Sequence, residues 1–170
     1  GDYDYKVIGV GRLNGVTHNE ANSAGFLLTG NTYTTANTFA FAGHNNLPNS
    51  AVATSLGAGV QQRWNRSWYI DFTNTLTVDA TFDLGEGIGG GSPVNKDNYV
   101  LLKWNGSQWI NTGVASANKF INGDRISFRI TNAAGDGAYT LGTIDAATSP
   151  VAGINIRTWY SYQSGNWNNP

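Results

Sequence analysis

Side chains that could act as acids, bases or nucleophiles are few in this sequence, and they are widely separated. The two histidines, His18 and His44, each precede an asparagine and are expected in loops. A serine–histidine–aspartate arrangement needs a sharply presented nucleophile, and no Gly-x-Ser-x-Gly segment occurs. Glu86 with Asp79 or Asp83 could form the two carboxylates of a glycosidase, but Glu86 stands in a glycine-rich stretch that would not keep a general acid protonated. We therefore expect no catalytic residues and no enzymatic activity.

Oxygen-bearing side chains near expected loops make calcium the metal that the sequence suits best. Asp2 and Asp4 share one face of an extended chain, and Asp97 stands between Asn95 and Asn98. Calcium is bound by carboxylate, amide and carbonyl oxygens of this kind. No segment has the spacing of an EF-hand loop or of a glycine–aspartate nonapeptide repeat. We expect no cofactor, and we take Asp2, Asp4 and Asp97 as candidate ligands of a structural calcium ion.

Two tryptophans flank the strongest hairpin signal in the chain, the Asn-Gly pair at residues 105–106. A two-residue loop would place Trp104 opposite Ser107 and Leu102 opposite Trp109. A four-residue loop would pair the two tryptophans directly. In either register both indoles lie on one face of the sheet.

The tryptophan pair admits two interpretations. The indoles could present a platform on which a sugar ring stacks, with the amides of Asn105 and Gln108 bonding its hydroxyls. Alternatively, they could pack as a cross-strand cluster that stabilises the hairpin. The six tryptophans of the chain need burial somewhere, which favours the second interpretation. The candidate carbohydrate-binding residues are Trp104, Asn105, Gln108 and Trp109.

The composition indicates which elements must position these side chains. Glycine, asparagine and threonine supply 22, 21 and 17 of the 170 residues, whereas charged residues make up 12%. Glycine and asparagine disfavour helix interiors, and threonine favours strands. The length fits one domain. These features predict many short strands joined by turns, and no helix.

Alternation of apolar and polar residues locates the strands. In residues 76–84, the side chains at even positions are apolar, and those at odd positions are polar. Residues 125–131 alternate in the same way, and in residues 64–72 Trp64 and Trp68 share a face that Tyr69 opposes. Further strands are expected at residues 5–10, 25–28, 37–42, 55–60, 99–104, 108–112, 138–143 and 154–162, and a glycine-rich loop at residues 85–92.

The predicted fold class is all-β. About ten strands without helical crossovers favour a two-sheet antiparallel β-sandwich, jelly-roll or immunoglobulin-like. Asp136-Gly137, between residues 125–131 and 138–143, is a candidate for a second hairpin turn. We expect one β-sandwich module over residues 1–153. Residues 154–170 would be a C-terminal strand and a linker, or the start of a following module.

The charge and the sulfur content indicate which classes of partner are not expected and which cellular location suits the protein. The net charge is −1 without a basic stripe, so nucleic-acid binding is not expected. No apolar run approaches the roughly 18 residues of a membrane span. Cysteine and methionine are absent. With few lysines and abundant asparagine, threonine and tryptophan, the composition suits a secreted bacterial protein. The chain starts without methionine, which predicts a mature or excised segment.

Three stretches together resemble a known module type: residues 66–71 with residues 81–84, residues 135–143, and residues 7–12 ahead of residues 39–45. They are similar to β-sandwich modules of very large, multidomain proteins that gliding, polysaccharide-degrading bacteria secrete through type IX systems. The resemblance spans residues 5–145, and residues 164–170 are similar to the start of another module of such proteins. The matching motifs are structural, so the resemblance implies a module type and no functional residue.

Two functions follow as expectations. The first is a non-catalytic, extracellular structural and adhesive module of a large bacterial surface or secreted protein. The alternative is a carbohydrate-binding module. The expected partners are a glycan or neighbouring protein modules, and self-association through edge strands or the tail is a further prediction.

Overall fold

The fold is known from a computed structural model of the chain. It describes residues 8–13, 16–18, 20–23, 26–33, 38–45, 55–64, 66–72, 76–83, 95–122, 125–131 and 135–151. This part of the chain forms thirteen β-strands and two 3-10 turns, η1 (Lys96–Asn98) and η2 (Ser116–Asn118), and contains no α-helix. No helix in it is long and apolar enough to cross a membrane. The all-β prediction is confirmed.

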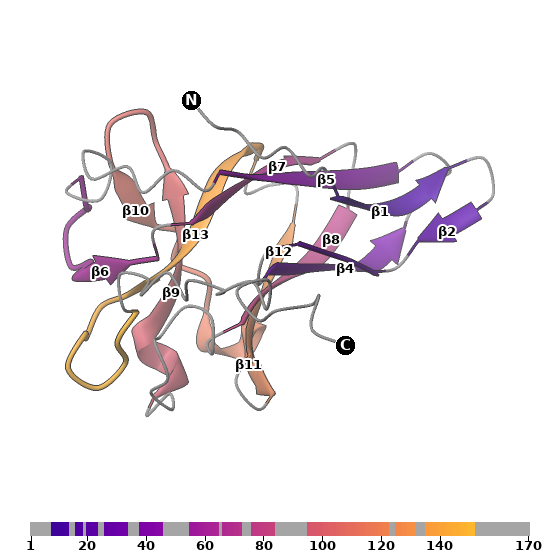
Figure 1. Ribbon diagram of the computed structural model, residues 1–170. Helices are drawn as coiled ribbons and strands as arrows, with labels where there is room; N and C mark the ends of the chain where they lie inside the picture. Colours follow the sequence, from indigo (N-terminus) through magenta and orange to yellow (C-terminus); the bar gives the residue numbers. More distant parts are fainter. Residues whose placement is uncertain are drawn as a thin grey trace, which may run out of the picture.

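The strands form two antiparallel sheets, and in Figure 1 β5 and β7 of one lie above β4 and β8 of the other. In the larger sheet the order is β10-β9-β13-β7-β5-β1-β2, and β6 also pairs with β13. Its strands are β1 (Ile8–Leu13), β2 (Val16–His18), β5 (Thr38–Asn45), β6 (Gln62–Arg63), β7 (Ser67–Phe72), β9 (Tyr99–Trp104), β10 (Trp109–Asn111) and β13 (Gly137–Thr143).

The smaller sheet has the order β11-β12-β8-β4-β3. Its strands are β3 (Glu20–Ser23), β4 (Phe26–Tyr33), β8 (Leu76–Asp83), β11 (Lys119–Asn122) and β12 (Arg125–Thr131). Three strands that the sequence did not indicate, β2, β3 and β11, are only three or four residues long. A stretch so short contains too few alternating positions to distinguish it from a loop. These strands raise the number above the ten or so expected.

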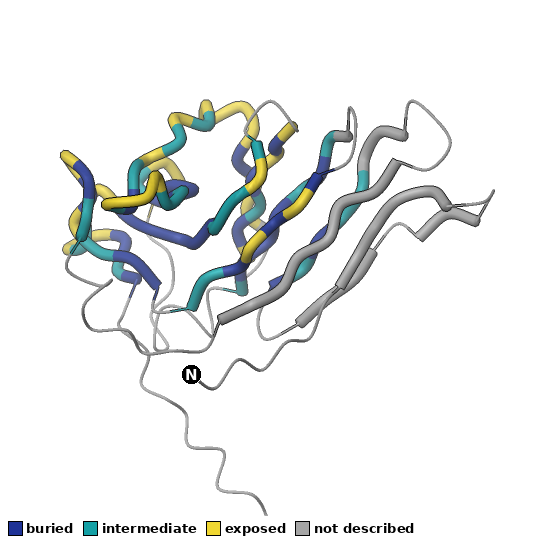
Figure 2. The backbone as a smooth tube through the Cα atoms, turned by 90° about the horizontal axis from the view of Figure 1, so that it is seen from above, coloured by how far each residue is buried: buried dark blue, intermediate teal, exposed yellow. Residues whose placement is uncertain are grey.

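The predicted alternation matches the burial of the strands. In β8, Val78, Ala80 and Phe82 are buried, and in β12 the same holds for Ile126 and its even-numbered neighbours. Figure 2 shows buried and exposed segments alternating along the strands. Because side chains of a strand point alternately to its two faces, each of these strands turns one apolar face inward.

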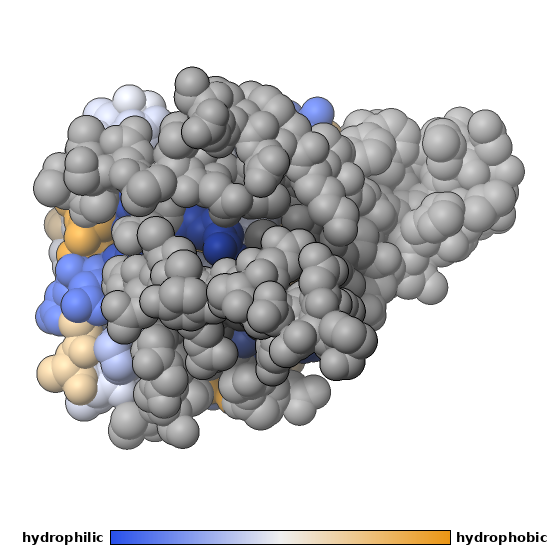
Figure 3. Space-filling model, viewed as in Figure 1, coloured by the Kyte–Doolittle hydropathy of each residue, from blue (hydrophilic) through white to orange (hydrophobic). Residues whose placement is uncertain are grey.

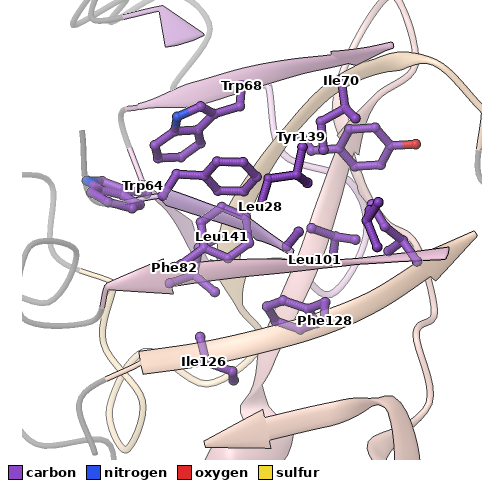
Figure 4. Packing of buried hydrophobic residues seen from close by; sticks show 14 of the residues in the cluster. Leu28, Trp64, Trp68, Ile70, Phe82, Leu101, Ile126, Phe128, Tyr139 and Leu141 are labelled. Atoms are coloured by element: carbon purple, nitrogen blue, oxygen red, sulfur yellow. The ribbon is translucent and has the colours of Figure 1, made fainter. Parts of the chain in front are cut away.

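Both sheets contribute to one hydrophobic core. The larger sheet supplies Trp68 and Ile70, and the smaller sheet supplies Phe26, Phe82 and Phe128. The ring of Trp68 stacks on that of Phe26, with centroids 4.8 Å apart, and the rings of Phe82 and Phe128 meet edge to face at 5.9 Å. In Figure 4 the side chains of Trp68, Ile70, Phe82 and Phe128 lie between strands of the two sheets. Stacked and edge-to-face rings are the favoured geometries of aromatic pairs, so the sheets are joined by specific packing.

Two separate strands, β6 and β7, both pair with β13, and Trp64 and Arg66 lie between them in the sequence. The backbone N–H of Trp64 still donates to the carbonyl of Leu141, at 2.8 Å. The hydroxyl of Thr140 donates to the carbonyl of Arg66 at 2.5 Å, and it lies 3.3 Å from the carbonyl oxygen of Trp64. This hydroxyl therefore gives the carbonyl of Arg66 a partner outside the strand ladder.

The second predicted hairpin is wrong. β12 pairs with β8 and β11 of the smaller sheet, whereas β13 pairs with β7 and β9 of the larger one. The chain therefore changes sheets between Thr131 and Gly137. The Asp-Gly pair marks the start of β13, because Asp136 lies in a bend and Gly137 is the first residue of the strand. A local turn signal does not specify which strand the following segment will join.

Several expectations lie outside the described residues. They are the glycine-rich loop at residues 85–92, the strand at residues 154–162 and the division of the chain at residues 153 and 154. The strand expected at residues 55–60 is reduced to an isolated bridge between Leu56 and Trp109.

Candidate functional site

The β9–β10 hairpin, which holds the candidate carbohydrate-binding residues, has the four-residue form of its loop. Trp104 pairs directly with Trp109, and the backbone N–H of Asn105 donates to the carbonyl of Gln108 at 3.1 Å. The side-chain oxygen of Asn105 accepts from the backbone N–H of Ser107 at 3.0 Å and from that of Gln108 at 2.9 Å. Gly106 has a φ of +100°, a conformation that residues with a side chain rarely adopt. The amide oxygen of Asn105 thus holds the turn.

The two indoles lie on one face, as the sequence predicted, but they do not form an open platform. Their ring centroids are 5.5 Å apart, and their planes are inclined by 54°. Trp109 is only 3% exposed, and it belongs to a cluster that also contains Val60, Val100 and Leu102. Trp104 is partly buried against the same cluster. The arrangement is the cross-strand packing that was the alternative interpretation, with one indole left partly open.

A segment before β6 covers the outer edge of β10. The backbone N–H of Trp109 donates to the carbonyl of Ser55, and that of Gly57 donates to the carbonyl of Trp109, both at 2.8 Å. A Cβ atom at Gly57 would lie 3.0 Å from that carbonyl oxygen of Trp109, so glycine permits the close approach. These bonds satisfy the edge of β10 and help to bury the Trp109 indole.

Arg63 packs over the face of Trp109, with its guanidinium carbon 5.0 Å from the ring centroid. Its Nη1 donates to the carbonyl of Trp64 at 2.7 Å, and the side chain is 6% exposed. Burial lowers the pKa of Arg63 to about 10. A cation–π contact and one carbonyl compensate only part of the desolvation of such a group. Arg63 therefore covers the face of the Trp109 indole on which a flat ligand would have to stack.

The remaining polar candidates keep some exposure. Asn105 is exposed, and Gln108 is partly buried. Figure 3 shows apolar and hydrophilic atoms meeting at the surface at the end of the molecule where Figure 1 places β10 and β6. The structure brings the four predicted residues together in one hairpin. It commits Trp109 and the oxygen of Asn105 to internal contacts.

Of the predicted metal ligands, Asp97 is the one that lies in the described part of the chain. Asp2 and Asp4 lie outside the described residues. The carboxylate of Asp97 accepts a hydrogen bond from the hydroxyl of Ser116 at 2.7 Å, and its backbone N–H donates to the side-chain oxygen of Asn95 at 2.9 Å. Within the described ranges no three histidine, cysteine, aspartate or glutamate side chains gather into a group that could hold a metal ion. The hydrogen bond between Asp97 and Ser116 connects η1 to η2. Calcium binding by Asp97 stays a prediction.

The two histidines lie in strands, where loops were expected. His18 lies in β2 and His44 in β5, so the loop prediction for both is wrong. Both are polar residues beside asparagine, a context that local sequence cannot distinguish from a turn. Asp79 forms a two-bond ion pair with Arg129 of the neighbouring strand, at 2.9 and 3.1 Å. This carboxylate therefore serves a cross-strand contact.

The residue that the candidate list missed is Tyr69, which is 59% exposed in the middle of β7. Its neighbours Trp68 and Ile70 are fully buried on the opposite face. The signal was present in the sequence, since Tyr69 was assigned to the face opposite Trp68. What the sequence could not show is that this outer face stays open at Tyr69.

Comparisons with known proteins add no family to this description. No protein-family model, no curated protein and no solved structure matches the chain. The resemblance to modules of type IX-secreted proteins therefore stays a prediction.

Proposed function

We propose that this chain is a non-catalytic structural and adhesive module of a large, multidomain bacterial surface or secreted protein. Its two sheets would pack as an antiparallel β-sandwich of jelly-roll or immunoglobulin-like kind, and its location would be extracellular. The observation that supports this proposal best is that polar side chains in the described loops form hydrogen bonds with the backbone of their own turns.

The turn side chains illustrate this use of polar groups. The carboxylate of Asp145 accepts from the backbone N–H of Ala147 and from the hydroxyl of Thr148, and the latter bond lowers the pKa of Asp145. The side-chain oxygen of Asn111 accepts from the backbone N–H of Gly113 at 2.9 Å. Bonds of this kind fix loop conformations, because they replace backbone partners that a turn lacks. A spacer or adhesive unit needs such rigid connections.

The core supports the same proposal. Side chains of both sheets meet there, among them Trp64 and Trp68, whose ring centroids are 5.1 Å apart. The described strands pair over long sequence separations, as β4 does with β8 and β7 with β13. A force pulling on such a module must break many strand pairs and a dry aromatic core together. Resistance to extension is the property that a stalk or filament unit requires.

Mechanical and adhesion measurements test the proposal. A tandem polyprotein of the chain, stretched between a surface and a cantilever, should give one cooperative unfolding event for each copy. Beads coated with the chain should be retained on a surface under flow more strongly than beads coated with albumin. The destabilised variant Trp68→Ala provides the matched control, since it should lower the unfolding force and the retention together.

Two results would contradict the proposal. One is retention no greater than that of the albumin beads, combined with unfolding that has no force peak. The other is turnover by the purified chain in a screen of glycoside, ester and peptide substrates, increasing in proportion to protein concentration.

A further inference from the structure

The open outer face of the larger sheet carries a second aromatic ring beside the hairpin. β13 lies between β9 and β7, and its Ala138 pairs directly with Tyr69. On the other side of β13, Tyr139 pairs with Lys103, so the next residue of β9, Trp104, lies beside Ala138. Ala138 and Trp104 both pack against the Trp109 cluster, which places them on the same face. Trp104, Ala138 and Tyr69 therefore form one row across three strands.

The spacing within this row keeps the rings of Trp104 and Tyr69 apart but allows one ligand to contact both. Adjacent strands lie about 4.8 Å apart, so the backbones of Trp104 and Tyr69 are about 10 Å apart. The residue between them, Ala138, carries a single methyl group. Tyr69 also pairs with Gly43 on its other side, which has no side chain at all. Small neighbours on both flanks explain why Tyr69 stays 59% exposed.

The strand segments that carry Trp104 and Tyr69 are held in place by packing contacts. Trp104 packs on Trp109, which the segment around Gly57 and the guanidinium of Arg63 hold in place. Tyr69 is flanked in β7 by Trp68 and Ile70, which are fully buried. A binding surface on strands held in this way is pre-organised, so little conformational entropy is lost when a ligand binds.

Polar groups border the row. Asp71 and Ser67 lie two residues to either side of Tyr69 on the same face of β7, and Asp71 is exposed. A carboxylate accepts strong hydrogen bonds from hydroxyl groups, and it repels an anionic ligand. Flat apolar rings with a hydroxyl acceptor beside them match the pyranose ring, which has C–H faces and a rim of hydroxyls.

We infer that Trp104, Ala138, Tyr69 and Asp71 form a binding face for a neutral polysaccharide, which lies across β9, β13 and β7 and stacks sugar rings on the two aromatics. This site differs from the predicted Trp104–Trp109 platform, because Tyr69 takes the place of the buried Trp109. The inference goes beyond the structural and adhesive role, since it names a surface and a ligand class for adhesion.

Calorimetric titration of the whole chain tests the site. The probes are β-1,4-linked hexasaccharides of glucose, mannose and xylose, with an oligogalacturonate as the anionic counterpart. We expect at least one neutral hexasaccharide to bind and the oligogalacturonate to bind more weakly. Tyr69→Ala should weaken binding about tenfold, as loss of an aromatic contact at the centre of an interface does. Tyr69→Phe, which keeps the ring, should retain most of the affinity.

The controls separate a lost site from a lost fold. Trp104→Ala should also weaken binding, but it removes part of a packed cluster, so Tyr69→Ala is the deciding variant. Phe120→Ala removes an aromatic ring that is 41% exposed on β11 of the other sheet, and it should leave binding unchanged. The inference is overturned if no neutral hexasaccharide binds, if the oligogalacturonate binds more tightly, or if Tyr69→Ala binds as well as the unchanged chain. None of these outcomes contradicts the mechanical part of the proposed function.

Discussion

The carboxylate of Asp136 accepts a hydrogen bond from the backbone N–H of Phe72, a residue 64 positions earlier in the chain, at 2.9 Å. Asp136 directly precedes β13, and Phe72 is the last residue of β7. The side chain thus supplies the acceptor at the point where the ladder between the two strands ends. An exposed aspartate of a turn thereby ties two distant segments together.

Removing this carboxylate should destabilise the fold modestly. Asp136→Ala leaves the N–H of Phe72 without its acceptor, and we expect a loss of about 1–2 kcal/mol in the free energy of unfolding. Asp136→Asn keeps an acceptor oxygen and should lose less. Urea denaturation of the three proteins measures the difference. Equal stability of the alanine variant and the unchanged chain would show that water replaces the carboxylate at no cost.

Two adjacent residues of β7 should respond in opposite ways to truncation. Trp68 is fully buried between Phe26 and Phe82, so Trp68→Ala should lower the free energy of unfolding by about 3–5 kcal/mol. Tyr69→Ala, on the exposed face, should change it by about 0.5 kcal/mol or less. Chemical denaturation of both variants checks the assignment of faces. A large loss for Tyr69→Ala would show that its ring covers the sheet.

Gly142 should tolerate no side chain while Leu102 keeps its present position. A Cβ atom at Gly142 would collide with Cδ1 of Leu102 and lie 2.7 Å from its Cγ atom. Gly142→Ala should therefore cost about 1–3 kcal/mol through overpacking. Shortening the neighbour in the double variant Gly142→Ala/Leu102→Ala should remove the collision.

A double-mutant cycle measures this coupling from the four unfolding free energies. The double variant should be more stable than the sum of the two single losses indicates. Strict additivity would mean that the Leu102 side chain moves aside freely in the single variant.

Stability should fall in alkaline solution between pH 10 and pH 12. Burial raises the pKa of Tyr99 from 10.0 to about 12, and burial together with the charge of Asp136 does the same for Tyr139. Between these values the unfolded chain has released the two phenolic protons and the folded chain has kept them. Rising pH therefore favours unfolding, by about 1.4 kcal/mol per pH unit for each tyrosine. Below pH 10 these two groups should give no pH dependence.

Phenylalanine variants isolate the two tyrosines from Arg63, whose pKa of about 10 in the folded chain makes the unfolding free energy rise with pH in the same range and offsets part of the fall. Tyr99→Phe and Tyr139→Phe should each reduce the slope of unfolding free energy against pH, and the double variant should reduce it further. Slopes are compared because the hydroxyl of Tyr139 also donates to the carbonyl of Gly135, so its loss changes stability at every pH. An unchanged slope in the double variant would contradict the assignment.

The candidate site was predictable only in part. The Asn-Gly pair located the hairpin, because a turn of this kind depends on the conformational freedom of two neighbouring residues. The direct pairing of Trp104 with Trp109 was one of the two registers considered. The burial of Trp109 was not predictable, because it depends on the segment around Leu56 and on Arg63, which approach from more than forty residues earlier.

The sequence by itself determined the all-β class and the buried faces of the main strands. Val78 and Phe82 in β8, and Ile126 in β12, are buried as their alternation predicts, since a period of two is a local property of an extended chain. Only the tertiary structure decided which strands are neighbours. Partner choice follows from burying apolar faces across long separations, so β13 leaves β12 and joins β7 and β9. The same choice sets Ala138 between Trp104, which is partly buried, and Tyr69, which is exposed.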